Sequence, residues 1–433
     1  MHTLEQLRSG ALTGIRRLDL SADLTELPPE VFDLADTLEV LNLSGNRLTR
    51  LPPNLGRLHR LKIVFCSDNA FTHLPEVLGD CPALQVVGFK ANRIAHVPAS
   101  ALPPALRWLV LTDNAIAQLP AALGERPALQ KLMLAGNQLH SLPPSLAGAQ
   151  RLELVRLAAN QLPQLPGWLT ELPRLAWLAL AGNPLGWTLP PLPPLATVPW
   201  GQLQLGALLG EGASGHIYRV ERPHGATAEA LALKLFKGAV TSDGLPEHER
   251  AACLAAGQHP ALCTPSAELC DHPQGASGLL LPLMPPSLSN LAGPPSLDSC
   301  TRDVYPSGWH LDAHAAVRLA HTVAQAVAHL HAAGVMHGDL YAHNIVCNPA
   351  NGDALLSDFG AATRLPADQP ALSRALQALE VRALGCLLEE LAAHALAGAG
   401  VDALARLGQR CQHPQSGQRP TVAEVCGDLQ ALL

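Results

Sequence analysis

The sequence has few charged and few aromatic residues, which make up 15% and 3% of its 433 positions. Its formal net charge of −7 excludes the broad basic surface by which proteins bind nucleic acid. It has no apolar run long enough to span a bilayer, and Glu5 and Arg8 interrupt the apolar core that a signal peptide needs. These absences predict a cytoplasmic protein with no membrane span and no nucleic-acid partner.

The cysteines lack any metal-binding or redox spacing, and lysine is rare. None of the ten cysteines forms a CxxC pair or has the Cys/His spacing of a zinc site. We therefore expect buried free thiols, as in a reducing cytosol. Lysine occurs only as Lys62, Lys90, Lys131, Lys234 and Lys237. A lysine inside a recognisable motif therefore carries more weight here than in an average protein.

The first half of the sequence is a regular repeat. An asparagine recurs every 23 residues, with one 22-residue step, at Asn46, Asn69, Asn92, Asn114, Asn137, Asn160 and Asn183. Each unit follows the pattern LxxLxLxxNxLxxLP and opens with an apolar residue. This pattern resembles leucine-rich repeats, which stack into a solenoid with one strand per repeat. The resemblance implies eight repeats in a domain of residues 1–190.

Two features of the repeat predict its local structure. The asparagine side chain can bond backbone groups of adjacent turns that otherwise lack partners inside the coil. Leu-Pro pairs such as Leu51-Pro52 and Leu74-Pro75 predict extended outer segments with little helix, because the residue before proline avoids the α region.

The predicted concave face of the repeats is unusually apolar. In each strand, the residues that alternate with the core leucines face this side. An exposed apolar patch typically marks a protein-binding site, so we expect a partner or substrate to contact Val40, Ile63, Phe65, Trp108, Met133, Leu154 and Trp177. The alternative is that this stripe packs against the second half of the same chain.

A proline-rich segment, PLGWTLPPLPPLATVPW, begins at residue 184. Its proline density predicts a stiff, extended linker over residues 184–202 without strand or helix. Either Trp187 or Trp200 is expected to cover the exposed core of the last repeat.

The second half contains glycine, lysine and acidic motifs in a definite order. The pattern GxGxxGxV occurs at Gly210, Gly212, Gly215 and Ile217. Strand-like stretches flank it and no helix pattern follows at once, which favours a β-hairpin over a dinucleotide-binding turn. Farther along, Lys234 lies in the alternating stretch LALKL, Asp339 is followed five positions later by Asn344, and Asp358 begins Asp-Phe-Gly.

Taken together, these motifs resemble a protein kinase domain, which we place at residues 203–433. The resemblance implies an N-lobe of about residues 203–284 and a C-lobe of about residues 285–433. The expected fold class is therefore multidomain α/β and α+β, with a leucine-rich-repeat solenoid followed by a bilobal kinase-like domain.

The kinase resemblance also implies a role for each motif residue. Asp339 would position and deprotonate the acceptor hydroxyl, and Asn344 and Asp358 would bind Mg²⁺. Lys234, as a third catalytic residue, would hold the phosphates of ATP and pair with Glu249, for which Glu247 is the rival. ATP and Mg²⁺ are the expected cofactors. The nucleotide site would comprise Gly210, Gly212, Gly215, Ile217, Ala232, Lys234, Glu249, Pro282 and Met284.

Other stretches of the second half fit the same resemblance. Leu281 would be the gatekeeper, with the Pro282 carbonyl and the Met284 N–H facing adenine. The stretch from residue 311 to 335 has helical periodicity. Glu380 resembles the first residue of the buried helix F, with glutamate for the usual aspartate, and Arg419 resembles a structural arginine.

Several positions depart from the kinase pattern. Gly338 replaces the usual arginine, which argues against a phosphorylation switch, and Tyr341 replaces a lysine found in many Ser/Thr kinases. The segment from Gly360 to Glu380 is short and has no Ala-Pro-Glu. We therefore expect a protein kinase, acting on Ser or Thr, with a reduced peptide platform. The alternative is a pseudokinase scaffold that binds nucleotide and a partner without significant phosphoryl transfer.

Overall fold

A computed structural model describes residues 1–212, 214–224, 227–237, 240–241 and 243–433. The chain divides into two compact units. The first unit comprises Met1–Leu172 and Asn183–Leu185, and the second comprises Pro173–Gly182 and Gly186–Leu433. A short segment from the last repeat therefore belongs to the unit that contains the second half of the chain.

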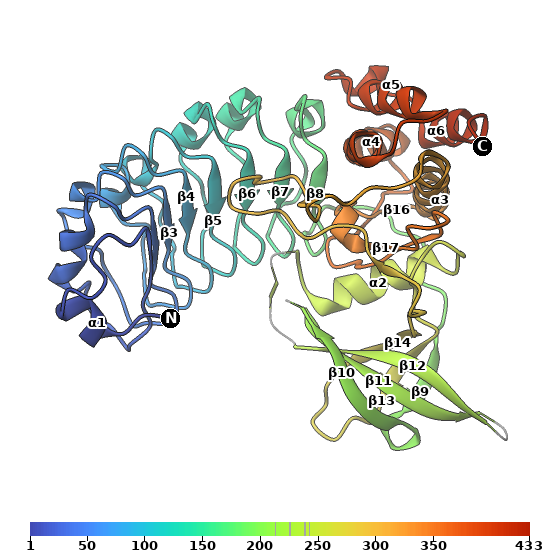
Figure 1. The fold of residues 1–433 in the computed structure, drawn as a ribbon, viewed down its shortest axis with the longest axis horizontal. Coiled ribbons are helices and arrows are strands. Elements are labelled where there is room, and N and C mark those ends of the chain that lie inside the picture. Colours follow the sequence, from blue (N-terminus) through green and yellow to red (C-terminus); the bar gives the residue numbers. More distant parts are fainter. Residues whose placement is uncertain (213, 225–226, 238–239, 242) are drawn as a thin grey trace. The chain divides into compact units, whose positions relative to one another are not determined.

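The first unit contains short parallel strands, one per repeat, as the 23-residue period predicts (Figure 1). They are β1 (Arg17–Asp19), β2 (Val40–Asn42), β3 (Ile63–Phe65), β4 (Val86–Gly88), β5 (Trp108–Val110), β6 (Lys131–Met133) and β7 (Leu154–Arg156). Equivalent residues of successive repeats pair in register, so that Val40 lies opposite Ile63 and Trp108 opposite Lys131. In the sheet order, β8 (Trp177–Ala179) follows as the eighth strand. The predicted solenoid is confirmed.

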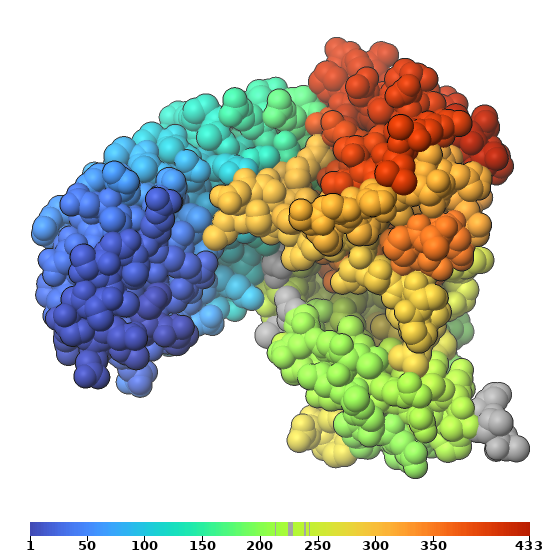
Figure 2. Space-filling view, in the orientation of Figure 1, coloured from blue at the N-terminus to red at the C-terminus, as the bar shows by residue number. Residues whose placement is uncertain are grey.

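Outside the strands, the first unit contains one short α-helix and a series of 3₁₀ helices. They are α1 (Leu4–Arg8), η1 (Pro29–Leu34), η2 (Leu55–Arg57), η3 (Glu76–Leu78), η4 (Ala99–Ala101), η5 (Ala121–Glu125), η6 (Pro144–Gly148) and η7 (Gly167–Glu171). The proline before such a turn is extended, as at Pro75, where φ is −61° and ψ is 125°. The outer segments therefore have little helix, as the Leu-Pro pairs predict. Figure 2 shows the repeats, coloured from blue to cyan, packed against one another in chain order.

The repeated asparagines form a hydrogen-bond ladder inside the coil. Asn160 is 1% exposed, and its Nδ2 donates to the carbonyl oxygens of Leu134 and Leu157 at 2.9 and 3.0 Å. Its Oδ1 accepts from the backbone N–H of Leu139 at 3.0 Å. Each asparagine thus joins its own turn to the preceding one, as the sequence predicts, because backbone groups buried in the coil need partners.

We expect Asn160→Ala to destabilise the first unit by about 2–4 kcal/mol, since it leaves buried backbone donors and acceptors without partners. The control is Asn54→Ala, because Asn54 is exposed and its side chain makes no capping hydrogen bond. Urea denaturation of both variants measures the difference. Equal unfolding midpoints would contradict the structural role assigned to the ladder.

The second unit begins with a six-stranded sheet in the order β10-β11-β12-β14-β13-β9 (Figure 1). Its strands are β9 (Ala196–Pro199), β10 (Gln204–Glu211), β11 (Gly215–His224), β12 (Thr227–Phe236), β13 (Ala267–Cys270) and β14 (Gly278–Pro282). β10 and β11 pair antiparallel, so the glycine motif forms a β-hairpin, as predicted. The helix α2 (Pro246–Ala256) lies between β12 and β13 in the chain, and η8 (Trp200–Gln202) precedes β10.

The predicted linker is wrong in one respect, because its end is a strand. β9 pairs parallel with β13 along the sheet edge, and Val198 is 4% exposed in the core of the sheet. Trp200 packs against the same core and against the ring of His272, with centroids 4.5 Å apart. Proline is tolerated in β9 because edge strands leave one side of the backbone unpaired. Trp200 therefore covers the core of the six-stranded sheet rather than a repeat.

The remainder of the second unit is mainly helical. Its helices are α3 (Ala313–Ala332), η9 (Ala342–Asn344), α4 (Pro370–His394), α5 (Val401–Cys411), η10 (Ser416–Gln418) and α6 (Val422–Gln430). Two small sheets, β15-β17-β18 and β16-β19, comprise β15 (Ser289–Asn290), β16 (Val335–Met336), β17 (Ile345–Cys347), β18 (Ala354–Leu356) and β19 (Thr363–Arg364). α3 confirms the helix predicted from residue 311 to 335. In the described part of the chain, no helix has the length and apolar character needed to cross a membrane.

Glu380 was expected at the start of a helix, and this prediction is wrong. It lies in the middle of α4, which already begins at Pro370 and is 25 residues long. Proline is favourable in the first turn of a helix, and the alanine and leucine that follow are strong helix formers. The side chain of Glu380 is nevertheless a structural anchor, because it accepts hydrogen bonds from the Gly338 N–H at 2.8 Å and pairs with His331 at 2.8 Å.

Glu390 on α4 is a partly buried carboxylate with a shifted pKa. Burial raises its pKa from 4.5 to about 7, although Arg302, 3.5 Å away, opposes the shift. Asp303 and Glu389 add to the rise, and the Tyr305 hydroxyl donates to Glu390 at 3.2 Å. Because the folded-state pKa exceeds the unfolded value, Glu390 contributes stability at low pH that is lost as pH rises through about 7.

We expect Glu390→Gln to stabilise the protein by about 2 kcal/mol more at pH 8 than at pH 5.5, because glutamine removes the cost of burying the ionised form. Urea denaturation at the two pH values measures this change. Glu247→Gln is the control, since Glu247 is an exposed glutamate on another helix, α2. A pH-independent difference between wild type and Glu390→Gln would refute the assignment.

Candidate functional site

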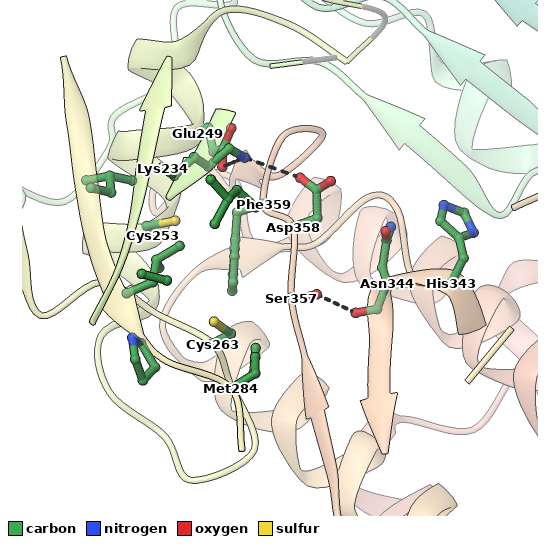
Figure 3. Close-up of a pocket in the computed structure, with 15 residues that line it drawn as sticks. Lys234, Glu249, Cys253, Cys263, Met284, His343, Asn344, Ser357, Asp358 and Phe359 are labelled. Atoms are coloured by element: carbon green, nitrogen blue, oxygen red, sulfur yellow. Dashed lines mark hydrogen bonds and ion pairs between the residues drawn. The ribbon is translucent and has the colours of Figure 1, made fainter. Parts of the chain in front are cut away.

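Lys234 lies at the centre of the six-stranded sheet and forms a buried ion pair with Glu249 (Figure 3). In the sheet register, Lys234 of β12 lies opposite Ile217 of β11 and opposite Leu279 of β14. Glu249 projects from α2 and is 4% exposed, whereas Glu247 on the same helix is exposed. Of the two predicted candidates, Glu249 is therefore the partner of Lys234.

The charge of the Lys234 amine depends on two carboxylates. Burial lowers the pKa of the amine, but Asp358 and Glu249 more than offset this effect and raise it above its ordinary value. The Lys234 Nζ lies 3.9 Å from the Asp358 Oδ1. The amine is thus held protonated at the point where the sheet meets the loop that begins at Asp358.

The Asp-Phe-Gly motif turns sharply and presents its aspartate to the cavity. Asp358 has a φ of +59°, and its Oδ1 accepts a hydrogen bond from the Gly360 N–H at 3.2 Å. Aspartate tolerates this left-handed backbone better than most residues because its side chain can bond the backbone locally. Phe359 is 1% exposed and packs against the His337 ring with centroids 5.2 Å apart. The buried phenylalanine therefore fixes the direction of the exposed Asp358.

Asp339 and Asn344 are joined directly. The Asn344 Nδ2 donates to the Asp339 Oδ2 at 2.7 Å and to the Asp339 backbone oxygen at 2.9 Å. The Asn344 backbone oxygen accepts from both the N–H and the hydroxyl of Ser357 at 2.9 Å. Asn344 thus connects the loop that carries Asp339 to the residue immediately before Asp358.

A cavity of about 270 Å³ lies between these groups (Figure 3). Eight of the predicted site residues line it: Ile217, Ala232, Lys234, Glu249, Pro282, Met284, Asn344 and Asp358. A smaller cavity of about 100 Å³ is lined by Gly212 and Gly215 of the hairpin together with Lys234 and Asp358. Gly210 and Asp339 line neither of these two cavities.

The glycines of the hairpin serve different purposes. A Cβ at Gly215 would lie 2.3 Å from the Leu235 backbone oxygen, so only glycine permits the close pairing of β11 with β12. At Gly210 and Gly212, a Cβ would meet nothing within 4 Å among the described atoms. These two positions therefore leave open space along the hairpin. Ala213, between them and Gly215, lies outside the described residues.

His343 is a residue of the cavity wall that the sequence reasoning missed. Its Nδ1 lies 2.7 Å from the Asp303 Oδ1, and its backbone N–H donates to the Asp303 Oδ2 at 3.0 Å. Burial lowers the pKa of His343, but the bond to Asp303 reverses this effect and the net shift is upward. Asp303 lies in a loop 40 residues away, so no local pattern pointed to the pair. Cys253, Cys263, Leu279, Leu281, Ser357 and Phe359 also line the cavity.

Three of the seven residues of the expected partner surface are buried. Ile63 is 9% and Leu154 is 3% exposed, so neither offers enough surface to a partner. Trp177 is 2% exposed and its indole N–H donates to the Leu340 backbone oxygen at 3.0 Å within the second unit. It therefore cannot take part in an exposed partner-binding surface. For this residue the alternative reading, packing against the second half of the chain, is correct.

Comparisons with known proteins agree with these observations. The protein kinase domain model matches residues 203–381, and leucine rich repeat models match residues 127–185 and 37–58. The chain is a leucine-rich-repeat array followed by a protein kinase domain. No curated protein matches the sequence. A solved leucine-rich-repeat protein of Leptospira interrogans is 29% identical over 39% of this chain and 49% of that chain, with a TM-score of 0.34.

We expect Glu249→Gln to weaken nucleotide binding by the kinase domain about tenfold, because it removes a charge that holds the Lys234 amine in the cavity. The control is Glu247→Gln on the same helix. Titration with a fluorescent ATP analogue measures both affinities. If the two variants bind equally well, the ion pair does not organise the cavity.

Proposed function

We propose that the protein transfers the γ-phosphate of Mg-ATP to a protein hydroxyl, of Ser or Thr, and that the repeats recognise a partner or the substrate. The observation that carries this proposal is the convergence of Lys234, Glu249 and Asp358 on one cavity, with Asn344 joined to Asp339 beside it. These side chains come from four separate segments of the chain.

The cavity fits an Mg-nucleotide. Ile217, Ala232, Leu281 and Met284 provide an apolar wall for a base, and Lys234 provides a positive charge for phosphates. The carboxylate of Asp358 and the amide oxygen of Asn344 are the hard donors that Mg²⁺ prefers, and the bound metal would neutralise charge on the phosphates. In the described part of the chain, no group of three His, Cys, Asp or Glu side chains could hold a metal ion.

Asp339 is the candidate for orienting and deprotonating the acceptor hydroxyl. The hydrogen bond from the Asn344 amide holds one of its carboxylate oxygens at 2.7 Å. Asn344 would hold a metal through its amide oxygen, whereas its Nδ2 donates to Asp339. Asn344 would therefore contact both the candidate base and the metal.

The repeats remain the candidate surface for a protein partner. Val40, Phe65, Trp108 and Met133 are partly exposed on the concave strands of the first unit. We propose that they recognise the partner or substrate, without the buried Ile63, Leu154 and Trp177. The domain boundaries at residues 190 and 433 and the cytoplasmic location remain predictions.

The pseudokinase scaffold is the second candidate, favoured by two observations. Tyr341 is 4% exposed and stacks on Trp177, so no cationic side chain extends from that position into the site. Only nine residues separate Gly360 from the start of α4 at Pro370, which leaves little chain for a peptide platform. In this reading, the cavity binds nucleotide and the repeats bind a partner without phosphoryl transfer.

We expect wild type to transfer labelled phosphate from ATP, and Asp339→Asn to reduce transfer by about 100-fold or more, because it removes the acceptor for the hydroxyl proton. Asp353→Asn, at an exposed position that pairs with Arg318, is the matched control. A labelled-ATP assay on the purified full chain measures all three. Background-level signal from wild type and Asp339→Asn alike would support the scaffold instead.

A further inference from the structure

The segment Pro173–Gly182 is part of the same compact unit as the kinase domain and contacts the loop that carries Asp339. At its centre, strand β8 places the Trp177 indole N–H 3.0 Å from the Leu340 backbone oxygen. Leu340 directly follows Asp339 in the chain. Trp177 therefore holds the peptide unit next to the candidate base, although it lies outside the residues matched by the kinase family model.

The same indole also determines where Tyr341 lies. The rings of Trp177 and Tyr341 stack with centroids 4.2 Å apart and planes 8° apart. The backbone oxygen of Tyr341 accepts from the Asn344 N–H at 3.2 Å. One buried side chain thus reaches both ends of the loop: Asp339 through Leu340, and the candidate metal ligand Asn344 through Tyr341.

The glycine at position 338 has a physical explanation in this contact. Gly338 has a φ of +73°, and a Cβ there would lie 2.6 Å from the Leu178 backbone oxygen and 2.7 Å from the Ala361 backbone oxygen. An arginine at this position, as in most kinases, cannot fit beneath β8. The glycine that departs from the family pattern is therefore what allows β8 to pack this close to the loop.

Both ends of the segment are also tied to the kinase domain. The Leu180 N–H donates to the Thr363 Oγ1 at 3.2 Å, which connects the segment to β19. The Arg382 Nε on α4 donates to the Arg174 backbone oxygen at 3.0 Å. Arg419, 7% exposed, donates to the Pro173 backbone oxygen at 3.3 Å. The contact at Trp177 is thus the middle of a continuous attachment rather than an isolated one.

We propose that Trp177 is a positioning residue for phosphoryl transfer, through which strand β8 holds the catalytic loop in its working geometry. The proposal rests on the kinase function proposed above. In kinases that have arginine at the position of Gly338, a phosphate on the activation loop can hold that region by charge. In this protein, β8 of the last repeat holds the loop around Leu340 and Tyr341 by a buried hydrogen bond and a ring stack. The loop is therefore kept in place without a phosphorylation event.

This arrangement has a direct kinetic consequence. Trp177 does not line the nucleotide cavity, so its loss leaves ATP binding in place. Asp339 and Asn344 would shift, and shifts of about 1 Å in a reacting group can slow a reaction by about 100-fold. The effect is therefore expected in kcat and not in the KM for ATP.

The test compares Trp177→Phe and Trp177→Leu with matched substitutions of Trp168, which lies on η7 of the preceding repeat. Phenylalanine keeps the ring stack and loses the indole donor, whereas leucine loses both. We expect kcat to fall several-fold in Trp177→Phe and about 10- to 100-fold in Trp177→Leu, with the KM for ATP within about twofold of wild type. Trp168→Phe and Trp168→Leu should keep the wild-type kcat. A graded loss in the first pair marks positioning, because general unfolding would also abolish ATP binding.

Hydrogen exchange of the amides of residues 339–344 provides a readout that does not depend on activity. The proposal expects faster exchange in Trp177→Phe and Trp177→Leu than in wild type and the Trp168 variants, while α3 stays protected. Unchanged exchange, or an unchanged kcat in an active enzyme, overturns the positioning role. Absence of transfer by wild type with faster exchange in the Trp177 variants overturns the kinase function alone and leaves the structural attachment of β8 in place.

Discussion

The ion pair between the buried Lys234 and Glu249, with the exposed Asp358 beside it, is the constraint on which the kinase domain depends. An ammonium group at the centre of a sheet is costly to desolvate unless carboxylates compensate it. Glu249 supplies this compensation from α2 and Asp358 supplies it from the loop after β18. This arrangement therefore joins the sheet, its helix and the helical part of the unit. It also leaves one cationic group facing the cavity, which is what binding of a triphosphate requires.

The loop that carries Asp339 depends on a second set of contacts, most of them uncharged. A tryptophan donor, a ring stack and a glycine with no room for a side chain hold it between β8 and α4. Glu380 on α4 also holds the loop, because it accepts a hydrogen bond from the Gly338 N–H. Buried hydrogen bonds and close packing are less sensitive to salt and to cellular signals than exposed ion pairs are.

Several elements were predictable because their signals are local. The asparagine ladder follows from a 23-residue period, and the hairpin follows from glycines between two alternating stretches. The choice of Glu249 over Glu247 was harder, since the spacing to His259-Pro260 fits neither perfectly. The structure separates the two, because α2 buries Glu249 and leaves Glu247 exposed. The strand β9 was missed because the prolines of the linker argue against strand pairing, whereas an edge strand tolerates proline.

By itself, the sequence determined the repeat period, the identity of the polar residues around the cavity and the order in which they occur. These are properties of neighbouring residues, and periodicity and motif spacing record them directly. Only the tertiary structure decided that Trp177 meets Leu340, 163 positions away, and that His343 pairs with Asp303. Such pairs depend on how separate segments pack. Burial of apolar surface and pairing of polar groups stabilise any arrangement that achieves both, so a local sequence pattern does not identify the partner residue.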